Sequence, residues 1–542
     1  MSATGEVEKP AEEKITAPTA GELLYCGATS WDNIGRRNGA LAGENLVSPT
    51  RLRPLVNVNI RFVASGCVSC HCVALDVEGR CYTWGRNEKG QLGHGDTLQR
   101  DRPTIVSELL KHKVVRAGAG RNHTVAVTDD GNSFAFGWNK HGQLGSGSLK
   151  NEVEMSPVKC LVSQAKSAVC GADFTVWLSS VEGSSILTAG LPQYGQLGHG
   201  TDNEYNVKEA SVRLAYEPQP RPRAIAAFTK KSVTIVKVAC GTNHTVAVDT
   251  NGYVYTWGFG GYGRLGHREQ KDEWEPRLVE VFQRQNVLPP DAVVSAGSTN
   301  SACTAAGGQL YMWGKLKNTG DDWMYPKPLM DLSGWHIRCM DSGYMFHFCG
   351  ADNSCISWGH AQYGELGYGP NQQKSCSIPK KVDILESMHV ISVACGMGHS
   401  LMLVDRTNVG DKLEQLDIYD GKVLPEEGYE DDVATEIPKK RYANSPSNSK
   451  KRKKSKNSSD SEEDEEEVDE DSNESGEDQN GEPVKRQRGR KASSRGRGRG
   501  GRKSEPERKS SGRGSGRARA DVNVSQSGRG RGKAGRRGRG RK

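Results

Sequence analysis

The chain of 542 residues carries a formal net charge of +8, which averages two unlike parts. Residues 439–542 hold 32 basic and 17 acidic residues, a net charge of +15, and the preceding 438 residues have a net charge of −7. No apolar run approaches the roughly 20 residues of a membrane-spanning helix, and the polar segment 1–20 lacks the regions of a secretory signal. We therefore expect no membrane association, a disordered segment 1–20, and a reducing compartment in which the 14 cysteines stay thiols.

A repeated unit follows this segment. Residues 66–95, 120–145 and 241–267 each hold an opening Gly, a His, an alternating run, a polar turn with Gly, a second alternating run and a Gly-x-Leu-Gly loop. Alternating runs joined by a turn such as Asp249–Gly252 predict a β-hairpin, because Asn and Gly accept positive φ. An all-β repeat of about 50 residues is typical of a propeller blade.

Two glycine series give the number of repeats, since each series has seven members. The chain begins with a second half-unit, Leu24 to Gly35, and ends its repeats with a first half-unit, Val390 to Asp405. We therefore predict an all-β, seven-bladed propeller over residues 21–424, closed by its two terminal half-blades so that no sheet edge is left open. The glycines that end the second run are Gly27, Gly85, Gly137, Gly190, Gly258, Gly314 and Gly359, and those that open the first run are Gly66, Gly120, Gly171, Gly241, Gly297, Gly343 and Gly396.

The first motif that suggests chemistry is Cys67-Val68-Ser69-Cys70-His71, the pattern of covalent haem attachment. However, His71 stands at the repeat position of His123 and His244, and no second Cys pair follows at zinc-finger spacing. A catalytic His would be needed once, whereas a repeated His is typical of a scaffold. We therefore predict a strand interior here and a structural hydrogen bond for the repeated histidines.

The second motif, Gly258 to Gly263, satisfies Gly-x-Gly-x-x-Gly, but a dinucleotide site needs a helix directly afterwards. The segment Arg264–His267 that follows is instead typical of a blade loop. No unit breaks the repeat to bring a Ser/His/Asp set or a pair of carboxylates together, so a hydrolase or metalloenzyme ranks last. We expect no catalytic residue, no metal and no cofactor.

Three longer strings, WGRNEKGQLGHGD (84–96), WGFGGYGRLGH (257–267) and YGELGYG (363–369), resemble the regulator of chromosome condensation repeat family over roughly residues 23–424. They are closer to a second branch of that family than to its founding Ran exchange factor. The resemblance implies a propeller that binds a small GTPase or a chromatin component. In that branch the basic segment precedes the propeller, whereas here it follows.

A plant ultraviolet-B photoreceptor shares the implied fold and absorbs light through clustered tryptophans. Its recurring Gly-Trp-Arg-His-Thr string has no match here, and the nearest approach, Gly334–Arg338, is single. Photoreception therefore ranks behind a binding function. The tryptophans at the blade-end position, for which we predict a packing role, are Trp84, Trp257, Trp313 and Trp358.

One interval of the repeat is longer than the others and carries an insertion, residues 201–237. An insertion on one blade of a rigid ring is a usual place for a partner contact, and a tolerated surface loop is the alternative. Arg268–Glu273 is a second charged stretch of this kind, for which a solvated loop is favoured. The candidate partner-binding residues of the insertion are Arg213, Arg221, Arg223, Lys230 and Lys231.

The repeat ends near Leu424, and Tyr442 is the last aromatic residue of the chain. A segment without aromatics cannot bury enough apolar surface to offset chain entropy, so residues 425–542 are predicted to be disordered. Within 439–456, two basic clusters resemble a two-part nuclear-import signal, and they comprise Lys439, Lys440, Arg441, Lys450, Lys451, Arg452, Lys453 and Lys454. An acidic block, 460–478, follows candidate phosphorylation sites at Ser458, Ser459 and Ser461.

Residues 485–542 contain 23 basic and three acidic residues, laced with Arg-Gly pairs. Such arginines neutralise phosphates, and without aromatics to stack on bases no sequence readout is expected. We therefore predict salt-sensitive, sequence-independent binding to DNA or RNA. The candidate nucleic-acid-binding residues are Arg486, Arg488, Arg490, Arg495, Arg497, Arg499, Arg502, Arg529, Arg531, Arg536, Arg537 and Arg539.

Together these features predict a monomeric nuclear interaction protein, with nucleolar or chromosomal placement left open. Its propeller would hold a protein partner while its tail holds nucleic acid. Guanine-nucleotide exchange on a small GTPase is the alternative, and it rests on the family resemblance alone. An exchange factor forms no covalent intermediate, so the sequence offers no catalytic dyad for it.

Overall fold

The computed structural model describes residues 20–36, 45–207, 212–317, 319–352, 354–407 and 409–421. The predictions for the N-terminal segment, the nuclear-import clusters, the phosphorylation sites and the nucleic-acid-binding arginines lie outside these residues. No helix in the described ranges combines the length and the apolar character that crossing a membrane requires.

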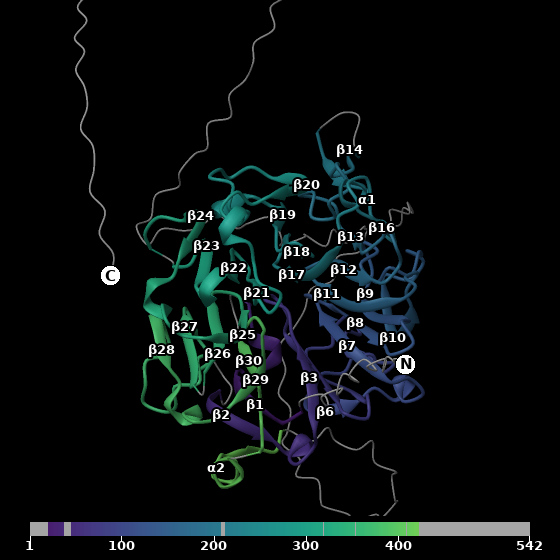
Figure 1. Cartoon of the computed structure of the whole chain (residues 1–542). Coiled ribbons are helices and arrows are strands. Elements are labelled where there is room, and N and C mark those ends of the chain that lie inside the picture. The colour runs from purple at the N-terminus through teal and green to yellow at the C-terminus, as the bar shows by residue number, and fades with distance from the viewer. Residues whose placement is uncertain are drawn as a thin grey trace, which may run out of the picture. The chain divides into compact units, whose positions relative to one another are not determined.

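Seven sheets surround a central axis (Figure 1), which confirms the seven-bladed propeller. Six of them have four antiparallel strands, and the seventh has a fifth, parallel strand. Blade 1 consists of β3 (Ile60–Ala64), β4 (His71–Asp76), β5 (Cys81–Gly85) and β6 (Arg100–Ile105), and blade 2 consists of β7 (Val114–Ala119), β8 (His123–Thr128), β9 (Ser133–Trp138) and β10 (Val153–Lys159). Blade 3 consists of β11 (Ala165–Cys170), β12 (Phe174–Ser179), β13 (Ile186–Gly190) and β16 (Gln219–Ala224). Blade 4 consists of β17 (Ile235–Cys240), β18 (His244–Asp249), β19 (Val254–Gly258) and β20 (Glu273–Leu278).

The remaining blades follow the same order from the axis outwards. Blades 5 and 6 consist of β21 (Val294–Ala296), β22 (Asn300–Thr304), β23 (Leu310–Gly314) and β24 (Trp323–Pro328), and of β25 (Ile337–Ser342), β26 (Phe346–Ala351), β27 (Ser354–Gly359) and β28 (Cys376–Lys381). Blade 7 combines β29 (Val390–Cys395) and β30 (His399–Val404) with β1 (Glu22–Gly27), β2 (Leu46–Leu52) and the short β31 (Ile418–Tyr419). Two short helices are α1 (Ala226–Thr229) and α2 (Gly410–Glu414), and blade 3 also carries the hairpin β14 (Glu204–Asn206) and β15 (Leu214–Tyr216).

The ring closes in blade 7, where the two ends of the repeat region meet. Strand β1 pairs antiparallel with β30, and Leu24, Tyr25 and Cys26 lie opposite Met402, Leu401 and Ser400. The prediction of closure by two half-blades is thus confirmed. A buried ion pair that the sequence did not reveal reinforces the closure, because Glu22 contacts Arg51 at 2.9 Å and Arg406 at 2.6 Å.

The glycine that ends each third strand is required by the backbone. All seven have φ between 95° and 125°, a region that residues with a Cβ rarely adopt. A Cβ added at any of them would also lie only 2.4 to 2.6 Å from a backbone atom of the first residue of the neighbouring second strand or of the residue just before it. The sevenfold recurrence of this glycine therefore follows from the close approach of two strands.

The apolar core is divided among the blade interfaces. In one cluster, Val246 and Val254 of blade 4 pack with Cys303 and Trp313 of blade 5. All four blade-end tryptophans are buried in such clusters, which confirms their predicted packing role. Because each blade buries its apolar face against the next, stability is spread around the whole ring.

Candidate partner-binding face

The loop between the third and fourth strands of a blade bridges to the next blade. In blades 1, 2, 3, 4 and 6 this loop contains Gly-x-Leu-Gly, and we call a loop with this string a bridging loop. In blade 1, the carbonyl of Gln91 accepts a hydrogen bond of 2.8 Å from the Thr124 hydroxyl of blade 2, and the amide of Gly95 donates to the Met155 carbonyl at 2.9 Å. The same pattern in blade 4 joins the carbonyl of Arg264 to Ser301 of blade 5.

These bridging loops all lie on one face of the propeller, because antiparallel strands bring every third-to-fourth connection to the same side. Three blades depart from the regular loop on this face. Blade 3 adds the hairpin β14–β15, blade 5 has a shortened loop without Gly-x-Leu-Gly, and the described part of the blade 7 loop, residues 28–36, also lacks this string. These three loops distinguish their blades from the others on this face, so they are the candidate binding sites.

The hairpin of blade 3 projects beyond the blades in Figure 1 and forms a groove with blade 4. The groove has a volume of about 750 Å³ and opens beside Trp274, whose side chain is 45 % exposed. Further apolar side chains of the hairpin, including Tyr205 and Val212, are also exposed. We call this site the hairpin groove, and it is lined by Gln193, Tyr194, Gly200, Asp202, Glu204, Tyr216, Lys271, Asp272, Glu273, Trp274 and Glu275.

The hairpin groove is acidic, since its lining holds five carboxylates and one lysine. Glu273 is paired with Arg277 at 2.7 Å, but no ion pair within the described chain reaches Asp202, Glu204 or Glu275. Burial raises the pKa of Asp272, whose carboxylate accepts a hydrogen bond from the Gly260 amide at 2.8 Å. An exposed indole beside unpaired carboxylates suits a basic segment of a partner, which gains both Coulomb attraction and cation–π contact.

The five basic residues proposed for the insertion do not form one cluster. Arg213 lies beside β15 on the bridging-loop face, whereas Arg221 and Arg223 lie in β16, the outer strand of blade 3. Lys230 and Lys231 follow α1, in a fourth-to-first-strand connection on the opposite face. All five side chains are exposed, but no single partner surface of ordinary size is defined by them together.

The second charged stretch, Arg268–Glu273, is part of the bridging loop of blade 4. The amide of Arg268 donates to the Met324 carbonyl of blade 5 at 2.9 Å, and its guanidinium lies 4.5 Å from the ring centroid of Tyr325. Glu269 pairs with Arg277 at 2.6 Å. Lys271, Asp272 and Glu273 of this stretch also line the hairpin groove. The groove forms only because the blade 3 hairpin lies beside this stretch.

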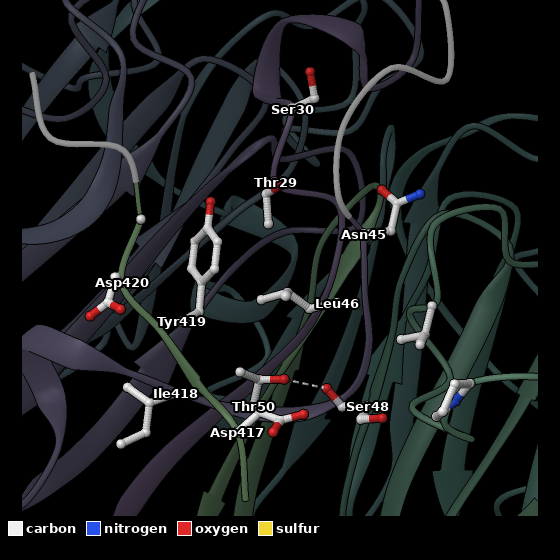
Figure 2. Close-up of a pocket in the computed structure, with 13 residues that line it drawn as sticks. Thr29, Ser30, Asn45, Leu46, Ser48, Thr50, Asp417, Ile418, Tyr419 and Asp420 are labelled. Atoms are coloured by element: carbon white, nitrogen blue, oxygen red, sulfur yellow. Dashed lines mark hydrogen bonds between the residues drawn. The ribbon is translucent and has the colours of Figure 1, made fainter.

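A further pocket lies at the closing blade, where β31 runs parallel to β2 (Figure 2). Its volume is about 670 Å³, and Figure 2 shows the Thr50 hydroxyl turned towards Ser48, whose carbonyl it meets at 2.8 Å. Asp417, Tyr419 and Asp420 of the C-terminal strand form another part of the lining. The described lining contains no histidine, cysteine or lysine.

The repeated histidines form structural hydrogen bonds, as predicted, but these bonds reach the adjacent blade instead of being local. Nε2 of His71 lies 2.7 Å from the Thr124 hydroxyl, and Nε2 of His123 lies 2.9 Å from that of Thr175. Burial lowers the pKa of His71 to about 3 and that of His123 to about 4, so both rings are neutral near pH 7. The prediction of a strand is confirmed for His71, which lies in β4 opposite Gly85, but it is wrong for Cys67–Cys70, which form the turn before β4.

The other motifs also take repeat positions. Gly258 ends β19, and Gly261–Gly263 forms one 3-10 turn followed by the bridging loop, so the helix that a dinucleotide needs does not follow. Cys67 and Cys70 are both buried, and burial raises the pKa of each thiol. Among the described residues, no three His, Cys, Asp or Glu side chains are grouped to hold a metal ion.

The family model described as "Regulator of chromosome condensation (RCC1) repeat" matches residues 78–127, 130–178, 185–248, 251–304 and 352–403, and a second model of the same description matches 62–91, 114–143 and 235–264. These stretches fall on the blades of the propeller. The family predicted from the repeat strings is therefore confirmed.

Individual relatives cover most of the propeller. Protein RCC2 of Mus musculus is 39 % identical over 428 residues, 74 % of this chain and 81 % of the relative. The ultraviolet-B receptor UVR8 of Arabidopsis thaliana is 30 % identical over 378 residues, 68 % of this chain and 78 % of the receptor. The crystal structure of Prp20p from Saccharomyces cerevisiae, reported with its binding to Gsp1p and histones, superposes with a TM-score of 0.55 at 20 % identity, over 74 % of this chain and 94 % of Prp20p.

Proposed function

Since the chain belongs to the family of regulator of chromosome condensation (RCC1) repeat proteins, we propose that it is a nuclear interaction protein with two binding modules. Its propeller binds a protein partner, either a chromatin component or a small GTPase, through a basic segment of that partner. Its Arg/Gly-rich tail binds nucleic acid without sequence preference.

The hairpin groove carries the propeller half of this proposal. Five carboxylates beside an exposed Trp274 form the kind of site that a lysine- or arginine-rich segment recognises by charge and by contact with an aromatic ring. The insertion that builds the groove is confined to blade 3, so this surface distinguishes this blade from the other six. The groove therefore marks one sector of the ring for a partner.

The groove is tested by reversing two exposed carboxylates that line it, Glu204→Lys with Glu275→Lys. Binding of purified core histones and of a panel of small GTPases is measured by calorimetry for this variant and for the unchanged chain. We expect at least a tenfold loss of affinity for the partner that binds. The matched control reverses two exposed carboxylates on the opposite face, Glu182→Lys with Glu280→Lys, and should bind normally. Equal losses in both variants would contradict a role for the groove.

The tail half rests on charge: 23 basic residues against three acidic ones in residues 485–542. A chain shortened by removal of residues 439–542 should retain the propeller, as its circular dichroism would show, but lose nucleic-acid affinity and nuclear retention. Affinity of the full chain for DNA and RNA should fall steeply with added salt, because binding releases counterions. Unchanged retention of the shortened chain in nuclei would refute this half of the proposal.

The alternative function, guanine-nucleotide exchange, predicts a different result with the same purified GTPases. An exchange factor accelerates release of a fluorescent guanine nucleotide, whereas an adaptor binds the GTPase without changing that rate. We expect binding without acceleration. Faster release from any member of the panel would assign exchange activity to the propeller and replace the adaptor role.

A further inference from the structure

The interface between blades 5 and 6 lacks a bridging loop. Residues 315–322 connect β23 with β24, and they are too few to form a Gly-x-Leu-Gly turn of the regular kind. A cavity of about 710 Å³ lies between the two blades instead. In the five regular bridging loops the leucine is buried, and these leucines are Leu92, Leu144, Leu197, Leu265 and Leu366. Leu144, Leu197 and Leu366 pack in clusters that include residues of the next blade.

The floor of the cavity is Trp358, at the blade-end position of blade 6. At other interfaces, a bridging-loop glycine packs on the aromatic ring at this position. A Cβ added to Gly198 would lie 3.0 Å from Trp257, and one added to Gly266 would lie 3.1 Å from Trp313. Trp358, which is 4 % exposed, therefore stands at the place where a bridging-loop glycine packs elsewhere in the ring.

One wall of the cavity presents a backbone acceptor in the matching place. At regular interfaces a bridging-loop amide donates to the fourth strand of the next blade, as Arg268 does to the Met324 carbonyl at 2.9 Å. Met324 directly follows the residue that pairs with the blade-end glycine of its own blade. In blade 6 this position is Ser377, because Cys376 pairs with Gly359. Ser377 lines the cavity, and no described bridging loop donates to its carbonyl.

A buried histidine, His347, lies next to Trp358 but does not itself line the cavity. His347 lies opposite Trp358 in the strand register, and the two rings are 5.0 Å apart. Thr124 of blade 2 and Ser301 of blade 5 occupy the same register position as His347, each opposite the aromatic residue at the blade-end position. Their hydroxyls donate to a carbonyl in the bridging loop of the preceding blade. His347 is fully buried, its Nδ1 lies 3.0 Å from the Ser342 hydroxyl, and its Nε2 has no hydrogen-bond partner within the described chain.

We propose that the cavity between blades 5 and 6 binds a linear peptide of a partner protein that contains a Gly-x-Leu-Gly-like sequence. The peptide takes the place of the missing bridging loop. Its leucine enters the apolar part of the cavity, beside Met312, Leu316 and Trp323, and its following glycine lies on Trp358. The five regular loops of this chain serve as the template for the occupant, since each fills the equivalent place at its own interface.

The polar contacts of the bound peptide follow from the same template. A peptide amide donates to the Ser377 carbonyl, and Nε2–H of His347 donates to a peptide carbonyl. Burial lowers the pKa of His347 to about 3, so the ring is neutral, and a bond accepted by Nδ1 leaves the proton on Nε2. The rim holds two aspartates and two lysines, so selection rests on the leucine and the glycine rather than on net charge.

The test uses the full-length chain and a synthetic peptide with the sequence of residues 86–97, RNEKGQLGHGDT. Isothermal titration calorimetry should give saturable binding with one site and a dissociation constant on the order of 100 µM. A peptide with Leu92→Asp should bind at least tenfold more weakly, because its carboxylate would enter the apolar cavity. Absence of saturable binding up to about 2 mM, or equal binding of both peptides, would overturn the proposal.

Two exposed residues provide matched variants of the chain. Met330 is 66 % exposed and lines the cavity, whereas Ile378 is 57 % exposed, neighbours Ser377 and does not line it. Met330→Asp should weaken the peptide at least tenfold, and Ile378→Asp should leave its affinity unchanged. Equal affinities in the two variants would place the peptide elsewhere and reject this site.

A third variant fills the cavity from within. Residues 315–322 are replaced by residues 86–99 of blade 1, so that blade 5 acquires a regular bridging loop. We expect a higher melting temperature and loss of peptide binding, because the grafted leucine occupies the cavity. Peptide binding that persists in the stabilised graft would overturn the proposal.

Discussion

Two neighbouring interfaces of the ring, between blades 4 and 5 and between blades 5 and 6, show what the bridging loop contributes. At the first, Leu265 is buried, the Arg264 carbonyl accepts from Ser301, and the Arg268 amide donates to blade 5. At the second, these groups have no counterpart within the described chain, and a cavity opens.

The second interface nevertheless remains closed along its inner part. Ala302 and Met312 of blade 5 pack in one apolar cluster with Ile337, Cys349 and Trp358 of blade 6. The first three strands of each blade therefore supply the packing that holds these two blades together, and the bridging loop adds to this core from the outside. Loss of a single loop changes an internal packing site into a surface site without opening the ring.

The largest difference in stability between the two interfaces is expected when a leucine is truncated at each of them. Leu265→Ala should lower the free energy of unfolding by about 3 kcal/mol, because it leaves a cavity between blades 4 and 5. Leu316→Ala, beside the existing cavity, should cost less than about 1 kcal/mol. Urea denaturation of both variants measures the difference, and similar losses would show that the shortened loop packs like a regular one.

Acidification should reveal the unusual histidine of blade 6. The pKa of His347 is lowered from 6.5 to about 3 by burial, so below pH 6.5 the unfolded chain takes up a proton that the folded chain refuses. The free energy of unfolding therefore decreases as the pH is lowered from 6.5 to 3, by about 1.4 kcal/mol per pH unit from this histidine. His347→Thr should lose about 2 kcal/mol less than the parent chain between pH 6 and 4.5.

The measurement compares urea denaturation of the parent chain and of His347→Thr at the two pH values. The other buried histidines are present in both proteins, so their contributions cancel in the comparison. An unchanged pH dependence would mean that His347 takes up a proton in the folded chain. That result would remove the neutral donor on which the peptide site depends.

A smaller loss of stability is expected from a difference between the third strands of blades 4 and 5, β19 and β23. Thr256 of blade 4 donates to the Leu265 carbonyl at 2.7 Å, whereas Met312 stands at this position in blade 5. Thr256→Val keeps the shape but leaves a buried carbonyl without this donor, which should cost about 1.5 kcal/mol. Thermal denaturation tests the value, and a stable variant would show that the hydroxyl does not hold the loop.

The smallest effect concerns the exposed end of the bridging loop. The Arg268 guanidinium lies over the ring of Tyr325, but its side chain is exposed, so Arg268→Ala should cost only about 0.5 kcal/mol. A loss as large as that of Leu265→Ala would contradict the view that the buried leucine, rather than the loop tip, stabilises the interface.

Much of the fold could be read from the sequence, because the same physical requirement recurs in every blade. The glycines that end the third strands are fixed by positive φ and by strand contact, and the repeated histidines by a hydrogen bond to the next blade. The offset of the two half-units predicted that the opening and closing strands lie side by side, and in the structure Leu24 pairs with Met402. Requirements of this kind are local or repeated, so they leave a pattern along the chain.

The binding sites could be read only in part. The insertion of blade 3 was visible as an extended interval, but the carboxylates of the hairpin groove come from two blades and were not grouped. The missing Gly-x-Leu-Gly string between β23 and β24 was a signal for the cavity, and its meaning depended on knowing which strand each loop covers. The charge and the composition of residues 485–542 predict nucleic-acid binding, and that prediction remains to be measured.

The sequence by itself determined the number of blades, their order and the place of closure, since hairpins and repeats depend on residues close together in the chain. Tertiary structure alone decided which surfaces meet. Gln91 and Thr124 are 33 positions apart, yet they bond because one blade stacks on the next. It separated Arg213 from Lys230 onto opposite faces, and it turned a short loop into a cavity, because both outcomes depend on how neighbouring blades pack.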